Sequence, residues 1–464
     1  MDGVTRVRTD DHDRAVAALV DSYAAIPAGE PVRLAKSTSN LFRPRATIGG
    51  PGLDASGLQR VVTIDPATRT AEVQGMCTYE HLVDATLAHG LVPLVVPQLR
   101  TITLGGAVSG LGIESTSFRN GLPHESVLEM DVLTGAGEVV TARPDGEHAD
   151  LFAAFPNSYG SLGYATRLRI ELEPVRDHVA LRNVGFTDLD ALVEAVGEVM
   201  SSGAWAGQRV DAMDGVVLAR DRAYLVLGTY VDEVPPTSDY VRDVYWRSIA
   251  ARSRDALTTR DYLWRWDTDW FWCSRALGVQ QPVVRRLWPA RYRRSDVYHR
   301  LIRLEHRFGV AERVDRWRGN PPRERVVQDV EIPLERTAGF LRWFAEHVPI
   351  SPLWLCPLRL RDAGRPGSGR RWPLYPLEPD RLYVNVGFWA AVTLAPGQAP
   401  DAHNRLVEQL VNDLSGHKSL YSTVHYSEDE FWRRYNGPAY RRLKQRYDPQ
   451  GRLPDLYDKC VRGR

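Results

Sequence analysis

The sequence predicts an α+β protein built from at least two regions, and three observations support this. Thr166, Leu168, Ile170 and Leu172 alternate as in a half-buried strand, whereas Ala15, Ala18, Leu19 and Tyr23 recur at helical spacing. Glycines gather between apolar runs over residues 105–112. A chain of 464 residues is long enough for more than one core. No strand–G-x-G-x-x-G–helix unit opens the chain, which disfavours a Rossmann fold.

The first region reads as short helices and strands up to Pro174. A helix is expected over residues 13–27, and a hairpin over residues 61–75 with Pro66 in its turn. Thr78 is expected to cap a helix over residues 79–89. A strand pair at residues 127–142 and a final strand follow.

The second region mixes both element types. Residues 187–201 predict an amphipathic helix, residues 209–232 and 382–388 predict strands, and residues 401–414 predict another helix. We therefore expect a division at residues 1–175, 176–400 and 401–464. Trp264, Trp266, Trp270 and Trp272 form a dense group that either walls an apolar channel or packs in the core.

Composition limits the classes of function. Hydrophobic residues make up 43% and charged residues 25%, as in ordinary globular proteins, and a net charge of +1 gives no basis for nucleic-acid binding. The four cysteines lack C-x-x-C spacing, so neither a disulfide nor a metal site is expected. Residues 1–14 contain no apolar segment typical of a signal peptide, and no apolar run approaches the roughly 20 residues of a membrane helix. We expect a cytoplasmic protein, with peripheral membrane contact left open.

The stretch from residue 93 to residue 122 carries the strongest chemical signal. Closely spaced glycines let a backbone approach a ligand, and several N–H groups in such a segment suit a diphosphate. The segment therefore indicates a dinucleotide cofactor, with a purely structural glycine turn as the alternative. The residues concerned are Thr103, Gly105, Gly106, Gly110, Gly112, Ser115 and Ser117.

Several short segments of the sequence together resemble one family. They are GLGIESTSFRNGL, AFPNSYGSLGY, RVVQDVEIP, SPLWLCP, GHKSLY, EDEFWRRYNGPAYRRL and LPDLYDK. In this order they resemble the vanillyl-alcohol-oxidase/p-cresol-methylhydroxylase (PCMH) superfamily. More narrowly, they resemble the delta-24-sterol reductases and actinobacterial reductases of 10-methyl-branched fatty acid synthesis. The resemblance implies a two-subdomain PCMH-type FAD-binding domain, an α+β substrate (cap) domain and a C-terminal segment that returns to the flavin.

The resemblance also implies the positions that bind FAD. The first phosphate loop falls on Lys36, Ser37, Thr38, Ser39 and Asn40, where no histidine is present, so FAD is expected to bind non-covalently. The second loop falls on the glycine stretch with Ser115 and Ser117, and the adenine side on Gly163, Tyr164 and Ala165. Lys418 in GHKSLY falls where relatives place a cation beside the flavin.

Several residues are candidates for the proton donor. Tyr421 and His425 lie in the tail, and Glu114 lies in the glycine stretch, where it is either an acid or a carboxylate that stabilises the segment. Asp329 and Glu331 share one face of a predicted strand, which faces either a pocket or solvent.

The function implied by the resemblance is an FAD-dependent, NADPH-driven reduction of an isolated C=C bond in a lipid. A 10-methylene fatty acyl chain, made by an upstream methyltransferase, is the first choice of substrate, and a Δ24-sterol is the second. An alcohol or lactone oxidase and a non-catalytic flavoprotein are the other classes. The arginine-rich segment 286–325 either meets an anionic head group or is a solvated surface.

Overall fold

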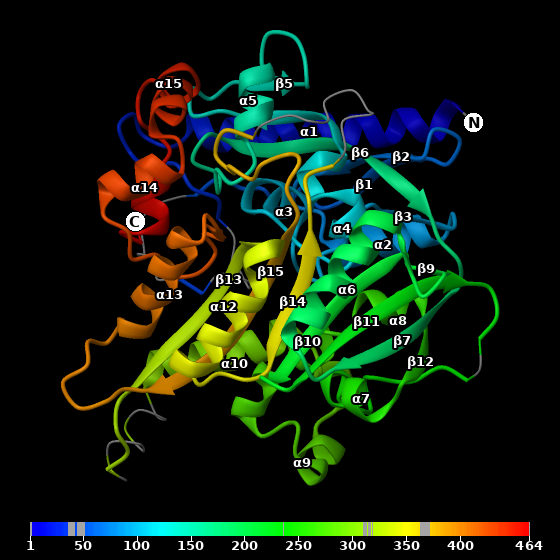
Figure 1. Cartoon of the computed structure of the whole chain (residues 1–464). Coiled ribbons are helices and arrows are strands. Elements are labelled where there is room, and N and C mark those ends of the chain that lie inside the picture. The colour runs from blue at the N-terminus through cyan, green and yellow to red at the C-terminus, as the bar shows by residue number, and fades with distance from the viewer. Residues whose placement is uncertain are drawn as a thin grey trace.

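A computed structural model of the chain describes residues 2–35, 42–43, 52–234, 236–309, 313, 317, 319–361 and 372–463. It contains two antiparallel sheets with helices around them (Figure 1). The predicted α+β class is confirmed. In the described part of the chain, no helix is both long and apolar enough to cross a membrane.

The first sheet has the strand order β1-β2-β6-β4-β5, with β3 also paired to β6. Its strands are β1 (Val61–Asp65), β2 (Thr70–Gln74), β3 (Leu91–Pro93), β4 (Val127–Leu133), β5 (Val139–Ala142) and β6 (Tyr164–Pro174). The predicted hairpin is present as β1 and β2, and its turn is held by the Asp65 carboxylate, which accepts the Ala67 N–H at 2.9 Å.

Helices surround this sheet. They are α1 (Asp2–Ala24), α2 (Tyr79–Leu87), α3 (Leu104–Gly110), α4 (Ser117–Asn120), η1 (Pro123–Ser126) and α5 (Ala149–Ala154). Thr78 caps α2 as predicted, because its side chain accepts the His81 N–H at 3.3 Å.

The glycine stretch is a helix over most of its length, where the sequence predicted a loop, and residues 111–116 follow it as irregular structure and a turn. Residues 104–110 form α3, which Thr103 caps by accepting the Gly106 N–H at 3.3 Å. Gly105 packs against β2, where a Cβ would come within 2.7 Å of the Gly75 carbonyl oxygen. These glycines therefore let a helix pack closely on the sheet, a use that glycine spacing alone does not distinguish from a loop.

The second sheet has the order β12-β7-β11-β10-β14-β15-β13-β16, and all its pairs are antiparallel. Its strands are β7 (His178–Phe186), β10 (Ala212–Ala219), β11 (Arg222–Val231), β12 (Arg254–Thr258), β13 (Arg323–Pro333), β14 (Leu353–Leu358), β15 (Tyr383–Thr393) and β16 (His417–Lys418). A separate ribbon is formed by β8 (Ala204–Trp205) and β9 (Gln208–Arg209).

One face of the second sheet packs against α6 (Leu189–Ser202), α12 (Leu334–His347) and α13 (Ala402–Asp413), whose apolar residues share a core with it (Figure 1). The other face packs against an aromatic segment that includes Phe271, whose ring contacts Trp354 of β14 and Trp389 of β15. Other helices of this part are α7 (Tyr245–Ala251), α8 (Thr259–Leu263), η2 (Asp267–Asp269), η3 (Cys273–Leu277), α9 (Pro282–Leu287), η4 (Ala290–Tyr292) and α10 (Ser295–Phe308).

The tail reaches back to the first sheet. It contains α14 (Glu428–Arg434), α15 (Gly437–Tyr447) and α16 (Leu456–Cys460). The Lys444 ammonium donates to the Ser161 carbonyl at 2.9 Å, and the Tyr447 hydroxyl donates to Asp150 at 2.7 Å. These contacts hold the tail against the first region, although the residues are far apart in sequence.

Candidate active site

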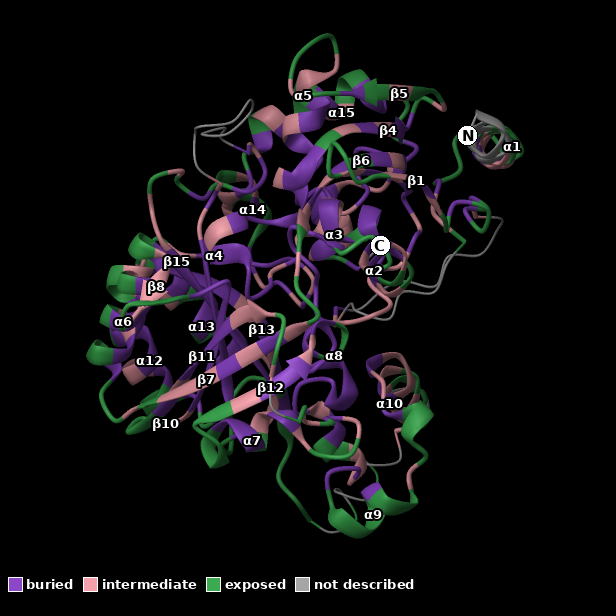
Figure 2. Cartoon of the chain, turned by 90° about the vertical axis from the view of Figure 1, so that its right-hand side faces the viewer, coloured by how far each residue is buried: buried purple, intermediate pink, exposed green. Residues whose placement is uncertain are grey.

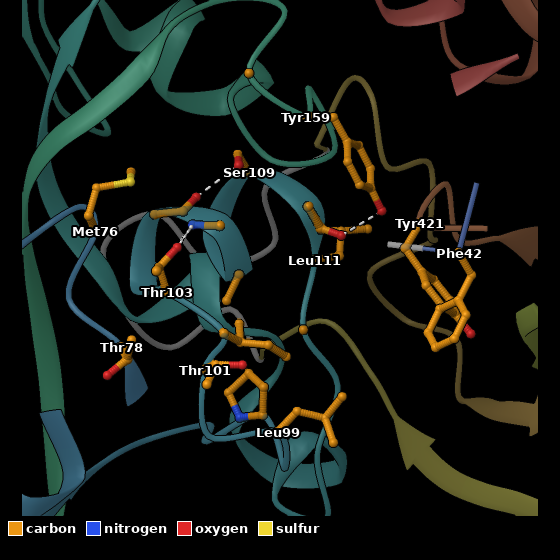
Figure 3. A pocket seen from close by; sticks show the side chains of 18 of the residues that line it. Phe42, Met76, Thr78, Leu99, Thr101, Thr103, Ser109, Leu111, Tyr159 and Tyr421 are labelled. Carbon is orange, nitrogen blue, oxygen red and sulfur yellow. Dashed lines mark hydrogen bonds between the residues drawn. The ribbon is translucent and has the colours of Figure 1, made fainter. Parts of the chain in front are cut away.

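A cavity of about 590 Å³ lies between the two sheets and the tail (Figure 3). That volume is typical of sites for small molecules and cofactors. The first region contributes the glycine helix and the start of β6, the second contributes aromatic residues, and the tail contributes Tyr421 and Lys459.

The structure brings most of the predicted cofactor residues to this cavity. Those that line it are Thr103, Gly105, Gly106, Gly110, Gly112, Gly163, Tyr164 and Ala165. Lys36, Ser37, Thr38, Ser39 and Asn40 lie outside the described residues. Ala35 and Phe42, on either side of them, both line the cavity.

Two predicted cofactor residues lie elsewhere. The Ser117 hydroxyl accepts the Glu114 N–H at 3.1 Å, and the Ser115 hydroxyl lies 2.9 Å from the Tyr262 hydroxyl. Both are buried, and neither lines the cavity. They hold the segment after α3 in place from behind the cavity wall.

Unusual backbone conformations concentrate around the cavity. Nine non-glycine residues of the described chain have a positive φ, and four of these line the cavity: Leu111 (62°), Tyr159 (50°), Trp270 (46°) and Phe271 (57°). Bulky residues adopt such angles only where surrounding contacts enforce them, most often at functional sites. The Tyr159 hydroxyl donates to the Gly110 carbonyl at 2.8 Å and so ties two of the strained segments together (Figure 3).

Aromatic side chains form the wall on the side of the second sheet. Phe271 stacks on Trp389 with ring centroids 4.5 Å apart, and Trp354 lies 5.3 Å from Phe271. Trp270 also lines the cavity, where its ring is 5.4 Å from Phe42. By contrast, Trp264, Trp266 and Trp272 are buried in the main hydrophobic core. The tryptophan group therefore serves both of the roles that the sequence left open.

Asp329 places a carboxyl group in this apolar surrounding. It lies on β13 and lines the cavity, where its Oδ1 accepts the Asn385 side-chain N–H at 3.2 Å. Burial raises the pKa of Asp329 to about 6, while hydrogen bonds from Asn385 and Tyr421 and the charge of Lys418 act to lower it. A carboxyl with such a pKa exchanges a proton readily near neutral pH.

Tyr421 stands beside Asp329. Its hydroxyl donates to the Asp329 carboxyl and accepts the Trp389 Nε1–H at 2.9 Å. Burial, followed by the charge of Asp329, raises the pKa of Tyr421 well above its usual value, so this phenol stays protonated. Of the predicted catalytic residues, Tyr421 is the one that the structure brings to the cavity.

The other three predicted catalytic residues do not line the cavity. The Lys418 ammonium donates to the Ser422 hydroxyl at 3.1 Å and lies 3.7 Å from Glu408, and burial lowers its pKa. The ring of His425 lies 3.2 Å from Asp401.

Glu114 is held in a buried network behind the cavity. Its carboxylate lies 3.3 Å from Arg265 and accepts the Gln98 amide N–H at 2.6 Å. Arg265 also pairs with Asp214 at 2.9 Å, which links the first region to the second sheet. These contacts favour the stabilising role over the acid role.

Cations that the sequence did not single out lie at the cavity, among them Arg43 and Lys459. Lys459 from α16 lines it with its Nζ 5.6 Å from the Tyr164 ring centroid, and Arg43 donates to the Lys459 carbonyl. Burial and then the nearby Arg43 lower the pKa of Lys459 to about 7. A signal was available, because Lys459 ends the word LPDLYDK and is one of only four lysines.

The set of groups at the cavity suits FAD. The glycine helix and the start of β6 line the cavity, where their backbone can approach a diphosphate. Gly163, just before β6, has no room for a Cβ, which would lie 2.5 Å from Val132 of β4, so this glycine lets β6 pack on β4. Arg43 and Lys459 offer positive charge, and the aromatic wall gives an apolar surface for a ring system. All four cysteines are free thiols.

Comparisons with known proteins also indicate FAD. Residues 5–143 match the model of a family described as "FAD binding domain". The chain is 24% identical to the Delta(24)-sterol reductase of Arabidopsis thaliana over 89% of this chain and 77% of the relative. It is 24% identical to the Delta(24)-sterol reductase of Homo sapiens over 87% of this chain and 77% of the relative. Over 105 residues, 23% of this chain, the chain is 42% identical to Cytokinin dehydrogenase 6 of rice, Oryza sativa subsp. japonica, and covers 20% of it.

The family match spans the glycine helix and β1 to β5, and the similarity to the Delta(24)-sterol reductases covers 87–89% of the chain. The chain is therefore an FAD-dependent oxidoreductase with a PCMH-type FAD-binding domain that resembles the Delta(24)-sterol reductases.

Proposed function

We propose that the protein reduces an isolated C=C bond in a lipid, with NADPH as the electron donor. The observation that carries this proposal is the protonatable Asp329 carboxyl in an aromatic-walled cavity. The resemblance to Delta(24)-sterol reductases over most of the chain supports it.

The chemistry of such an alkene explains why an acid is required. An unconjugated C=C bond accepts hydride poorly, since no carbonyl group draws its charge away. Protonation of one alkene carbon, before or during hydride addition, places positive charge on the more substituted carbon. When bound, FAD supplies the hydride chemistry. The net change is one proton and one hydride added across the double bond, with NADPH oxidised to NADP⁺.

In this proposal Asp329 delivers the proton. Asn385 and Tyr421 orient its carboxyl, and Trp389 in turn fixes Tyr421. The rings of Trp389, Phe271 and Trp354 exclude water and present π faces, which stabilise positive charge that develops on a substrate carbon. Lys418 is a positioning residue here, because its charge lowers the pKa of Asp329 without reaching the cavity.

FAD is held non-covalently in the proposal. The backbone of the glycine helix and the start of β6 approach it, as do Ala35 and Phe42. Arg43 and Lys459 supply positive charge near its anionic groups.

Two lipids suit the chemistry, because both give a tertiary centre on protonation. A 10-methylene fatty acyl chain, supplied by a methyltransferase, is our first candidate, and a Δ24-sterol side chain is the second. Mass spectrometry of lipids from cells with and without the gene distinguishes them. Loss of the gene is expected to accumulate methylene fatty acids; accumulation of unsaturated sterols would select the second, and unchanged lipids would contradict both.

A flavin oxidase acting on an alcohol or lactone is the alternative, since such enzymes share the FAD-binding domain. Anaerobic mixing separates the two classes. Bleaching of the flavin by NADPH supports the reductase, and bleaching by an alcohol, with peroxide formed in air, supports the oxidase.

A further inference from the structure

Exposed apolar side chains are concentrated on one part of the molecule. Of the ten large apolar side chains that are exposed in the described part of the chain, seven lie between Val283 and Trp317. Leu287 is 78% exposed and Val283 is 73% exposed. Exposed apolar residues that gather in this way mark a contact surface more often than chance scatter does. Figure 2 shows α9 and α10, which carry most of them, at one edge of the molecule.

The same segment is strongly basic. Between Pro282 and Phe308 the sequence has eight arginines and two acidic residues, although the whole chain has a net charge of only +1. Part of this charge is used internally: Arg285 pairs with Asp269 at 2.6 Å, and Arg294 pairs with Glu80 at 2.8 Å. Arg286, Arg291, Arg300 and Arg303 are exposed.

Helix α10 connects this surface to the cavity. Arg300, Leu304 and Phe308 follow at intervals of four residues and therefore share one side of the helix. Arg300 and Arg303 line the cavity, whereas Leu304 and Phe308 are 50% and 57% exposed. One side of α10 thus runs from the cavity wall to the exposed apolar residues.

Internal contacts hold the surface in place. The Arg293 guanidinium donates to the Trp288 carbonyl at 2.8 Å, and the Trp288 ring lies 6.2 Å from the Tyr298 ring of α10. The Tyr298 hydroxyl donates to the Thr268 carbonyl at 3.0 Å. Val283 and Leu287, one turn apart on α9, therefore remain directed outward on a fixed support.

We propose that α9 and α10 dock the protein on an anionic phospholipid bilayer, so that the lipid substrate passes directly between the bilayer and the cavity. Apolar side chains flanked by arginines fit such a surface, because the apolar groups enter the acyl boundary while the arginines meet the phosphates. A second copy of this chain would have to bring like charges together. The purpose of docking rests on the proposed function, whereas the test of docking does not depend on that function.

The test is flotation of the full-length protein, reconstituted with FAD, with phospholipid vesicles. Vesicles of phosphatidylcholine with about a quarter of phosphatidylglycerol are compared with pure phosphatidylcholine at about 0.1 M salt. The protein is expected to float with the anionic vesicles. In Leu287→Asp/Phe308→Asp and in Arg286→Glu/Arg291→Glu, the partition coefficient is expected to fall about tenfold or more.

Matched controls lie on other surfaces. Leu406→Asp changes an exposed apolar residue of α13, and Arg222→Glu reverses an exposed charge at the start of β11. Both are expected to float as the unchanged protein does. Lack of flotation, equal flotation with neutral vesicles, equal loss in the controls, or a changed oligomeric state in Leu287→Asp/Phe308→Asp would overturn docking.

The proposed function is tested separately in the same samples. Reduction of the bound flavin by NADPH in solution needs no membrane, so the docking variants are expected to keep its rate. Flotation without any reduction by NADPH would count against the proposed function and leave docking intact. Reduction of the flavin by NADPH without flotation would count against docking and leave the proposed function intact.

Discussion

Asp329 on β13 stands directly opposite Gly387 on β15, and the missing side chain of Gly387 leaves room for the Asp329 carboxyl. A Cβ at Gly387 would lie 2.4 Å from Asp329 Oδ1 and 2.6 Å from the Trp389 ring. The strand that carries the proposed acid and the strand that carries the aromatic wall are thus fitted to each other at this one pair.

Gly387→Ala is expected to displace the Asp329 carboxyl, because the carboxyl end moves more easily than the backbone. We predict a loss of alkene reduction of at least about tenfold, with FAD binding and the rate of flavin reduction by NADPH retained. Steady-state and stopped-flow kinetics measure both. Gly339→Ala in α12 is the control: its Cβ would meet nothing within 4 Å, and alanine favours the helix by up to about 1 kcal/mol. Equal turnover in the two variants would contradict the fit.

Asp329→Asn removes the proposed proton donor. Alkene reduction is expected to fall by roughly 10²–10⁴-fold. In the unchanged protein the rate is expected to decline as pH rises through about 6, because Asp329 must be protonated to act. That decline is expected to disappear in the variant. A pH profile of alkene reduction that is the same in both proteins would remove Asp329 from the mechanism.

The same substitution gives a stability test. Because folding raises the pKa of Asp329 to about 6, the native state binds its proton more tightly, and the unchanged protein loses this contribution as pH rises through about 6. Asp329→Asn is therefore expected to raise the free energy of unfolding above pH 6 relative to the unchanged protein, by about 1–3 kcal/mol. Denaturant unfolding at about pH 5 and pH 8 measures the difference. If the substitution raises the free energy of unfolding more at pH 5 than at pH 8, the assigned pKa is contradicted.

Lys459 gives a prediction on cofactor affinity. Its pKa of about 7 means that it is only partly charged at neutral pH, and an anionic cofactor nearby favours the charged form. FAD affinity is therefore expected to rise as pH falls from 8 to 6. Lys459→Met is expected to weaken FAD binding about tenfold or more and to remove this pH dependence. Lys459→Arg is expected to bind FAD tightly, with no pH dependence of the affinity between pH 6 and 8. Flavin fluorescence titration measures these affinities, and unchanged binding in Lys459→Met would exclude the role.

Glu114 separates stability from catalysis. Removal of its carboxylate leaves Arg265 with one partner fewer in a fully buried network. Glu114→Ala is expected to lower the free energy of unfolding by about 3–5 kcal/mol. The molecules that remain folded are expected to keep the rate of alkene reduction per bound flavin. If the rate falls sharply while stability does not, Glu114 is an acid after all.

The sequence predicted the elements well wherever a local signal exists. The Thr78 cap and the β1–β2 hairpin depend on residues next to each other in the chain, and both are present. The glycine stretch predicts a loop where α3 is found, because sequence spacing does not reveal that Gly105 packs on Gly75.

The site was predicted in part for a similar reason. The glycines predicted at the cofactor from sequence motifs, and Tyr421, predicted as an acid from its place in the tail, line the cavity. The environment of Asp329 depends on Asn385, Gly387 and Tyr421, which arrive from two other segments. Whether its strand face met a pocket or solvent therefore stayed open until the pairing of β13 with β15 was known.

The most direct measurement is a single turnover without oxygen. The protein, loaded with FAD and reduced by NADPH, is mixed in D₂O with a 10-methylene fatty acyl lipid or with a Δ24-sterol. We predict that one of these lipids restores the oxidised flavin absorbance and becomes saturated, with deuterium from the solvent on the less substituted carbon. The account would be contradicted if the flavin stays reduced with both lipids and is oxidised only when air is admitted.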